Sequence, residues 1–269
     1  MEIQWSLVLF TALTGAAGWM LACVAVAEFK GICKNSAFIT TVVATVIAIV
    51  GGCASVTHLS HPERMLEALN HPTSGIFTEA VLVGITCIFA ILFMIFVKRN
   101  MSATARKVAI AGAAIFGMIL SFSAGVSYMM SSRAVWNTIL LPLGYLGTAI
   151  PTGIALYMLV VALRKEEFSE YALFGKALLG GGVIAAVLAG IYVGTLAAGG
   201  YDVLVLGWLL SVVVCGVCPA ALGAVMQKKP KSVLALAGCS VACALVGSVA
   251  FRCLMWVCTS SVANYFGQI

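Results

Sequence analysis

The sequence predicts an all-α integral membrane protein that crosses the bilayer eight times. Of its 269 residues, 62% are apolar and 9% are charged, against about 25% charged in an ordinary soluble domain. The apolar residues also fall into runs of about 20, the length of a membrane-spanning helix. Eight such spans leave room only for short connections. The chain therefore cannot hold a soluble catalytic domain, and a partner would have to supply any large cofactor-binding domain.

Each span is an apolar run bounded by polar residues. The expected spans are, in order, 5–27, 36–57, 78–97, 108–130, 137–163, 175–198, 203–226 and 232–258. These runs are continuously apolar, whereas the strands of a membrane β-barrel alternate over about 10 residues. A helical bundle is therefore favoured, and the one longer connection is the segment 58–77.

The cations predict how the spans are oriented. Twelve of the 15 Lys and Arg residues follow the first, third, fifth and seventh spans: Lys30, Lys34, Lys98, Arg99, Arg106, Lys107, Arg164, Lys165, Lys176, Lys228, Lys229 and Lys231. By the positive-inside rule these loops are cytoplasmic. Both termini and the segment 58–77 then face outward from the inner (cytoplasmic) membrane. The positive net charge marks one membrane face and does not indicate a nucleic-acid partner.

The first apolar run is expected to remain as a span, because no Lys or Arg precedes Lys30 to form the basic region of a signal peptide. The whole chain 1–269 reads as one transmembrane domain. Segments 14–21 and 152–159 resemble each other and run in the same direction, which suggests halves 1–135 and 136–269. These would be two four-helix bundles in parallel orientation. Chance similarity between apolar helices explains the resemblance equally well.

All three histidines, His58, His61 and His71, fall within the one outward loop 58–77. A transmembrane haem needs axial ligands on packed helices at membrane depth, so this placement argues against haem in the chain. Electrons from any redox reaction would then leave on the side where they entered.

The segment 58–77 predicts a short interfacial helix. Pro62 suits its first turn and Asn70 its end, and its apolar face would lie on the outer membrane surface. Glu63, Arg64 and Glu67 would face water or a partner, and we expect His61, Glu63 and Glu67 to dock that partner. The alternative is a helix that only caps the bundle.

Glu79 and Arg252 are charged residues within apolar spans, where an unpaired charge is costly. One interpretation is a buried ion pair that fixes helix register. The other is an outward-facing polar pocket with His58 at its rim, in which His58 and Glu79 accept protons released by a quinol.

The ten cysteines include Cys215 with Cys218 and Cys239 with Cys243, spacings that can indicate a metal site. They lie in apolar helix interiors without nearby histidines or cations to stabilise thiolates. We expect them to be packing residues and assign no metal to this chain.

Four motifs resemble those of a known membrane-protein family. They are Trp5-Ser6-Leu7 with Phe10-Thr11, His58-Leu59 with Pro62 and Arg64, Thr73-Ser74 with Glu79, and Trp136-Asn137-Thr138 with Pro142-Leu143. In this order and spacing the chain resembles the membrane anchor subunits of dimethyl sulfoxide reductase, among the quinol-interacting anchors of molybdenum enzymes. Ser6 stands where the family has proline, and the third motif keeps the carboxylate but lacks the family's Trp and Arg.

The resemblance implies an anchor without a metal centre of its own, used in anaerobic respiration. Its partners would be a molybdopterin catalytic subunit and a ferredoxin-like subunit with four iron-sulfur clusters, besides membrane lipids. It also implies a menaquinol site near His58, Arg64 and Glu79, to which we add Arg252. Electrons would pass directly to the iron-sulfur subunit.

Two other functions stay open at this point. A secondary transporter would use the two halves with Glu79 and Arg252, although Pro151 and Pro219 interrupt helices at unmatched positions. A purely structural anchor would have no quinone site.

Overall fold

A computed structural model gives the fold and describes residues 2–57, 67 and 70–259. Over these residues the chain is helical and contains no strand. The elements are α1 (Trp5–Lys30), α2 (Ala37–Val56), α3 (Gly75–Lys98), α4 (Ala103–Val126), α5 (Leu140–Leu163), α6 (Phe168–Ala198), η2 (Leu204–Val217), α7 (Cys218–Lys228), η3 (Pro230–Ser232) and α8 (Val233–Val257). Among the described residues, eight helices are long and apolar enough to cross a membrane, which confirms the predicted all-helical membrane fold.

Three helices begin earlier than predicted. Ser74 caps α3 by accepting a hydrogen bond from the Phe77 amide at 3.1 Å, and Ser102 caps α4 in the same way. Residues 75–77 are therefore helical and shorten the expected loop 58–77. The helix α6 starts at Phe168, ahead of the predicted 175, because Tyr171 and Phe174 are buried against the bundle.

The seventh span changes helix type along its length. Its first part, η2, is a π-helix and its second part, α7, is an α-helix. The change falls at Pro219, which lacks an N–H and whose ring would clash with the carbonyl one turn earlier in an uninterrupted α-helix. Together the two parts form a single candidate span, Leu204–Lys228.

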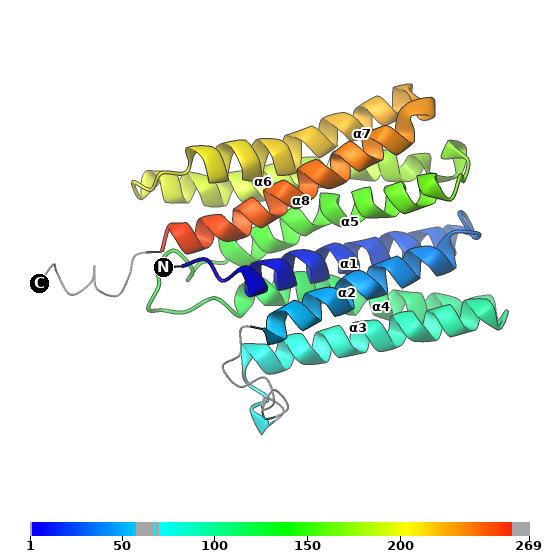
Figure 1. Ribbon diagram of the computed structural model, residues 1–269, viewed down its shortest axis with the longest axis horizontal. Coiled ribbons are helices and arrows are strands. Elements are labelled where there is room, and N and C mark those ends of the chain that lie inside the picture. The colour runs from blue at the N-terminus through cyan, green and yellow to red at the C-terminus, as the bar shows by residue number, and fades with distance from the viewer. Residues whose placement is uncertain (1, 58–66, 68–69, 260–269) are drawn as a thin grey trace, which may run out of the picture.

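The helices α1 and α5 lie at the centre of the bundle and pack against each other, as Figure 1 shows. On one side α1 also contacts α2 and α4, and on the other side α5 contacts α6 and α8. Gly18 of α1 and Gly117 of α4 meet without side chains between them, which lets these backbones approach closely. A division into two parallel four-helix bundles stays a prediction.

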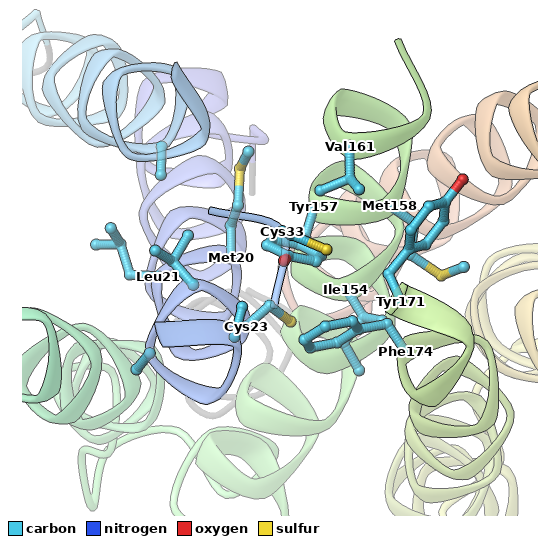
Figure 2. Packing of buried hydrophobic residues seen from close by; sticks show 14 of the residues in the cluster. Met20, Leu21, Cys23, Cys33, Ile154, Tyr157, Met158, Val161, Tyr171 and Phe174 are labelled. Atoms are coloured by element: carbon cyan, nitrogen blue, oxygen red, sulfur yellow. The ribbon is translucent and has the colours of Figure 1, made fainter. Parts of the chain in front are cut away.

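A buried apolar cluster fills the contact between α1, α5 and α6 (Figure 2). It includes Met20, Tyr157 and Met158, each 2% exposed or less. The rings of Tyr157 and Phe174 are 4.4 Å apart. This cluster fixes α5 and α6 against α1 near the end of the molecule where α1 ends and α6 begins.

The two ends of the bundle differ in their charges. We call the end where α1 begins and α8 ends, at the left of Figure 1, the terminal end. The opposite end, with the turns 31–36, 99–102 and 164–167, is called the basic end, because most Lys and Arg residues are there. The outward orientation of the terminal end remains a prediction.

Candidate functional site

The structure describes three of the predicted site residues, Glu67, Glu79 and Arg252. Glu67 is exposed, Glu79 is half-buried and Arg252 is fully buried. The other predicted site residues lie outside the described residues: His58, His61, Glu63 and Arg64. Glu79, Arg252 and the residues around them form the described part of the candidate site.

The first turn of α3 places Glu79 against the end of α4. A Cβ atom at Gly75 would lie 2.8 Å from the Ser127 hydroxyl oxygen, so only glycine permits this close approach. Glu79 lies one turn further along α3, near the Ser127 hydroxyl. The Ser127 hydroxyl donates its hydrogen bond to the Ser123 carbonyl at 3.2 Å. A carboxylate is thereby held at the terminal end, beside a hydroxyl and partly open to its surroundings.

Arg252 of α8 is 0% exposed and donates its hydrogen bonds to neutral groups. Its Nε donates to Thr11 Oγ1 at 2.8 Å, and its Nη1 donates to Ser248 Oγ at 2.7 Å and to Thr148 Oγ1 at 3.2 Å. Its Nη2 donates to the Thr11 carbonyl at 3.1 Å. These hydrogen bonds to groups on three helices offset part of the free-energy cost of burying the charge.

The predicted ion pair between Glu79 and Arg252 does not form. In the part of the chain that the structure describes, neither residue has an ion-pair partner. The physical reason is that hydroxyl groups on α1, α5 and α8 already surround the guanidinium and accept its hydrogen bonds.

Two tyrosines connect Arg252 to the neighbourhood of Glu79. The Arg252 guanidinium carbon lies 4.5 Å from the centroid of the Tyr145 ring, a cation–π contact. The Tyr145 and Tyr128 rings are 5.9 Å apart. Burial raises the pKa of the Tyr128 phenol well above its ordinary value, Tyr145 and Glu79 raise it further, and Arg252 opposes them. Tyr128 therefore lies near both charges and stays protonated.

An aromatic cluster surrounds Tyr128 at the terminal end. Its ring centroid is 5.9 Å from that of Trp136 and 6.1 Å from that of Trp256, both edge to face. The Trp136 indole donates to the Met255 carbonyl at 2.9 Å. Trp136 and Trp256 are 2% and 4% exposed, so both are buried here and do not form part of an interfacial belt. Trp5 at the start of α1 is exposed by contrast.

Sequence reasoning missed Tyr128, Tyr145 and the hydroxyls around Arg252. A buried arginine needs several acceptors, and the threonines of the first and fifth apolar runs were the available signal. The pairing of Thr11 with Arg252, however, joins the first span to the last. Only the tertiary arrangement reveals it.

The carboxylates of the basic end have defined structural partners. Arg106 Nε donates to Glu28 Oε1 at 2.9 Å in a partly buried ion pair. The Ser36 hydroxyl donates to Glu166 at 2.7 Å, and the Cys33 amide donates to Glu170 at 3.0 Å. The last two bonds tie the turn after α1 to the start of α6.

The cysteines do not gather into a metal-binding group within the described residues. All ten are free thiols. Cys215 lies against the Thr148 and Ala244 carbonyls, with sulfur–oxygen distances of 3.9 and 3.5 Å. This is how a small packing residue behaves.

An all-helical bundle of eight long apolar helices within the described residues defines a multi-pass membrane protein. The chain belongs to the family of DMSO reductase anchor subunits (DmsC), whose family model matches residues 1–257. No curated protein matches the chain. The resemblance seen in the sequence motifs is thus confirmed. Membership makes the chain a membrane anchor of a DMSO reductase-type complex and implies association with catalytic and iron-sulfur subunits.

Proposed function

We propose that this anchor binds menaquinol at the terminal end and passes its electrons to the iron-sulfur subunit of the complex. The observation that carries the proposal is the half-buried Glu79 carboxylate, which opens an apolar helix beside Ser127 and Tyr128 without an ion-pair partner among the described residues. A carboxylate in an apolar membrane span costs free energy, and it is retained where it is paired or has a functional role.

The residues at this end fit a hydroquinone. Such a ligand presents a flat apolar ring and hydroxyl groups that need hydrogen-bond acceptors. Glu79 supplies an acceptor, Ser127 a hydroxyl, and the half-buried Tyr128 ring an apolar surface backed by the buried rings of Trp136 and Trp256. Bound there, the quinol would supply two electrons and two protons.

Glu79 and His58 accept the two protons in this mechanism. Glu79 acts as a general base from α3, and His58 acts from the segment 58–66, which lies outside the described residues. Arg64 of the same segment orients a quinol oxygen or holds the segment against Glu79. Arg252 has its donors engaged by Thr11, Thr148 and Ser248, so we assign it an indirect role through the Tyr145 ring.

The partner surface is assigned to His61, Glu63 and Glu67, next to the quinol site. Of these, Glu67 is described and is exposed. The four-cluster iron-sulfur subunit would dock there and receive the electrons, and a molybdopterin catalytic subunit would reduce the terminal acceptor. Because protons and electrons leave on the same outward side, this route would not itself build a charge gradient.

The test compares two electron donors in the assembled, membrane-bound complex. Glu79→Gln and His58→Gln should each lower menaquinol-dependent turnover by about 100-fold or more, because a general base contributes at least that much. Turnover with a soluble dye that reduces the iron-sulfur subunit directly should be unchanged. Glu167→Gln is the matched control, since Glu167 is an exposed carboxylate at the basic end.

Normal menaquinol turnover in both Glu79→Gln and His58→Gln would contradict the proposal and leave a structural anchor. Equal loss with both donors would also contradict it, because the lesion would then lie in complex assembly.

A further inference from the structure

The Tyr128 ring is held in a fixed position at the terminal end. It follows Ser127 at the end of α4, and three aromatic rings surround it, those of Trp136, Tyr145 and Trp256. Its amide donates to the Gly125 carbonyl at 3.3 Å, which continues the last turn of α4. The position of the phenol is therefore set by packing and does not depend on a hydrogen bond of its own.

The Tyr128 hydroxyl differs from the two other phenols of this cluster. The Tyr145 hydroxyl donates to the Met255 sulfur at 3.1 Å, and the Tyr192 hydroxyl donates to the Val135 carbonyl at 3.1 Å. The half-buried Tyr128 hydroxyl has no hydrogen-bond partner within residues 2–57, 67 and 70–259. Its oxygen is not among the fully buried unpaired polar atoms of the described residues, so an approaching ligand oxygen could pair with it.

Tyr128 also lies close to the proposed base. Ser127, its neighbour in the chain, lies against Gly75 in the first turn of α3 and near Glu79. A donor and an acceptor are thus presented at the same end of the bundle. A hydroquinone needs both, an acceptor for the hydroxyl that loses its proton and a donor to the ring oxygens.

We infer that the Tyr128 hydroxyl is a ligand-contacting hydrogen-bond donor of the menaquinol site, acting opposite Glu79. This inference rests on the proposed function. Tyr128 keeps its own proton throughout, since Glu79 and His58 take the two protons and the iron-sulfur subunit takes the two electrons. Its contribution is to bind the quinol and to stabilise the negative charge that grows on the oxygen as its proton leaves.

The test is Tyr128→Phe in the assembled complex, which removes one hydroxyl and keeps the ring contacts. We expect about a tenfold rise in the KM for a menaquinol analogue and a similar rise in the Kd of a fluorescent quinol analogue, as for the loss of one hydrogen bond. Dye-dependent turnover and the amount of assembled complex should not change. Tyr201→Phe is the matched control, because it removes a phenol hydroxyl that follows α6 at the same end.

The outcomes separate this inference from the proposed function. Unchanged KM and Kd in Tyr128→Phe, together with loss of quinol turnover in Glu79→Gln, would overturn the role of Tyr128 alone. Unchanged quinol turnover in both variants would overturn the proposed site itself. An equal rise in KM in Tyr201→Phe would show a general effect of phenol removal and would also overturn the inference.

Discussion

The carboxylates at the two ends of the bundle differ in their ion-pair and hydrogen-bond partners. At the basic end, Glu28 pairs with Arg106, and Glu166 and Glu170 accept hydrogen bonds that close the turn after α1. At the terminal end, Glu79 has no ion-pair partner among the described residues, and the buried Arg252 donates to neutral groups. The basic end has more cations, yet the terminal end holds the charge that is costliest to bury.

This difference distinguishes charged residues that stabilise the fold from charged residues that can bind a ligand. A paired carboxylate at a helix end stabilises the fold and has little capacity left for a ligand. The Glu79 carboxylate and the Tyr128 phenol lack such partners in the described part of the chain, so both remain able to bind a ligand. Changes at the basic end should therefore lower stability, and changes at the terminal end should affect quinol chemistry.

The largest effect on stability is expected from Arg252→Ala, although Arg252 lies at the terminal end. The substitution removes a fully buried side chain and several hydrogen bonds, and we expect it to cost about 3 kcal/mol. Arg252→Met fills most of the volume, and Thr11 and Thr148 keep their own bonds to the Leu7 and Gly144 carbonyls, so it should cost less. Thermal unfolding of the two variants in detergent measures this, and equal losses would contradict the part assigned to packing.

A smaller effect is expected from the ion pair of the basic end. Glu28→Gln and Arg106→Gln should each lower the free energy of unfolding by about 1–2 kcal/mol, since the pair is partly buried, with side chains 7% and 26% exposed. Menaquinol and dye turnover should be equally unaffected. In a double-mutant cycle the two losses should not add, and additive losses would show that the residues do not interact.

The smallest effect concerns the thiols. The pKa of the Cys33 thiol is raised to about 11, mainly by burial. The nearby carboxylates of Glu166 and Glu170 also raise this pKa, and hydrogen bonding with Tyr157 lowers it. Below that pH the thiol stays protonated and unreactive. At pH 8 a water-soluble maleimide should therefore leave Cys33 unlabelled in the folded protein and label it after denaturation, as peptide mass spectrometry would show. Rapid labelling of Cys33 would contradict the tight closure of this turn.

The fold could be predicted from the sequence because hydropathy and span length depend on local composition. All eight spans were predicted, and the errors lay at helix ends, where Ser74 and Ser102 act as caps and where Tyr171 finds a buried contact. The π-helical form of η2 was not predicted, since neither length nor hydropathy distinguishes it from an α-helix.

The candidate site could be predicted only in part. Glu79 and Arg252 stood out because charge is rare in an apolar span. Their true neighbours did not, because Thr11 and Tyr128 come from helices far away in the sequence. Opposite charges suggested a pair, but the hydroxyls around Arg252 make that pair unnecessary.

The most direct test is the binding of a fluorescent quinol analogue to the assembled complex, followed by fluorescence quenching in wild type, Glu79→Gln and Glu28→Gln. The two substitutions remove the same charge at opposite ends of the bundle. A functional terminal end predicts wild-type quenching in Glu28→Gln and its loss in Glu79→Gln. Undiminished binding in Glu79→Gln, or loss in Glu28→Gln alone, would contradict the assignment of the quinol site to the terminal end.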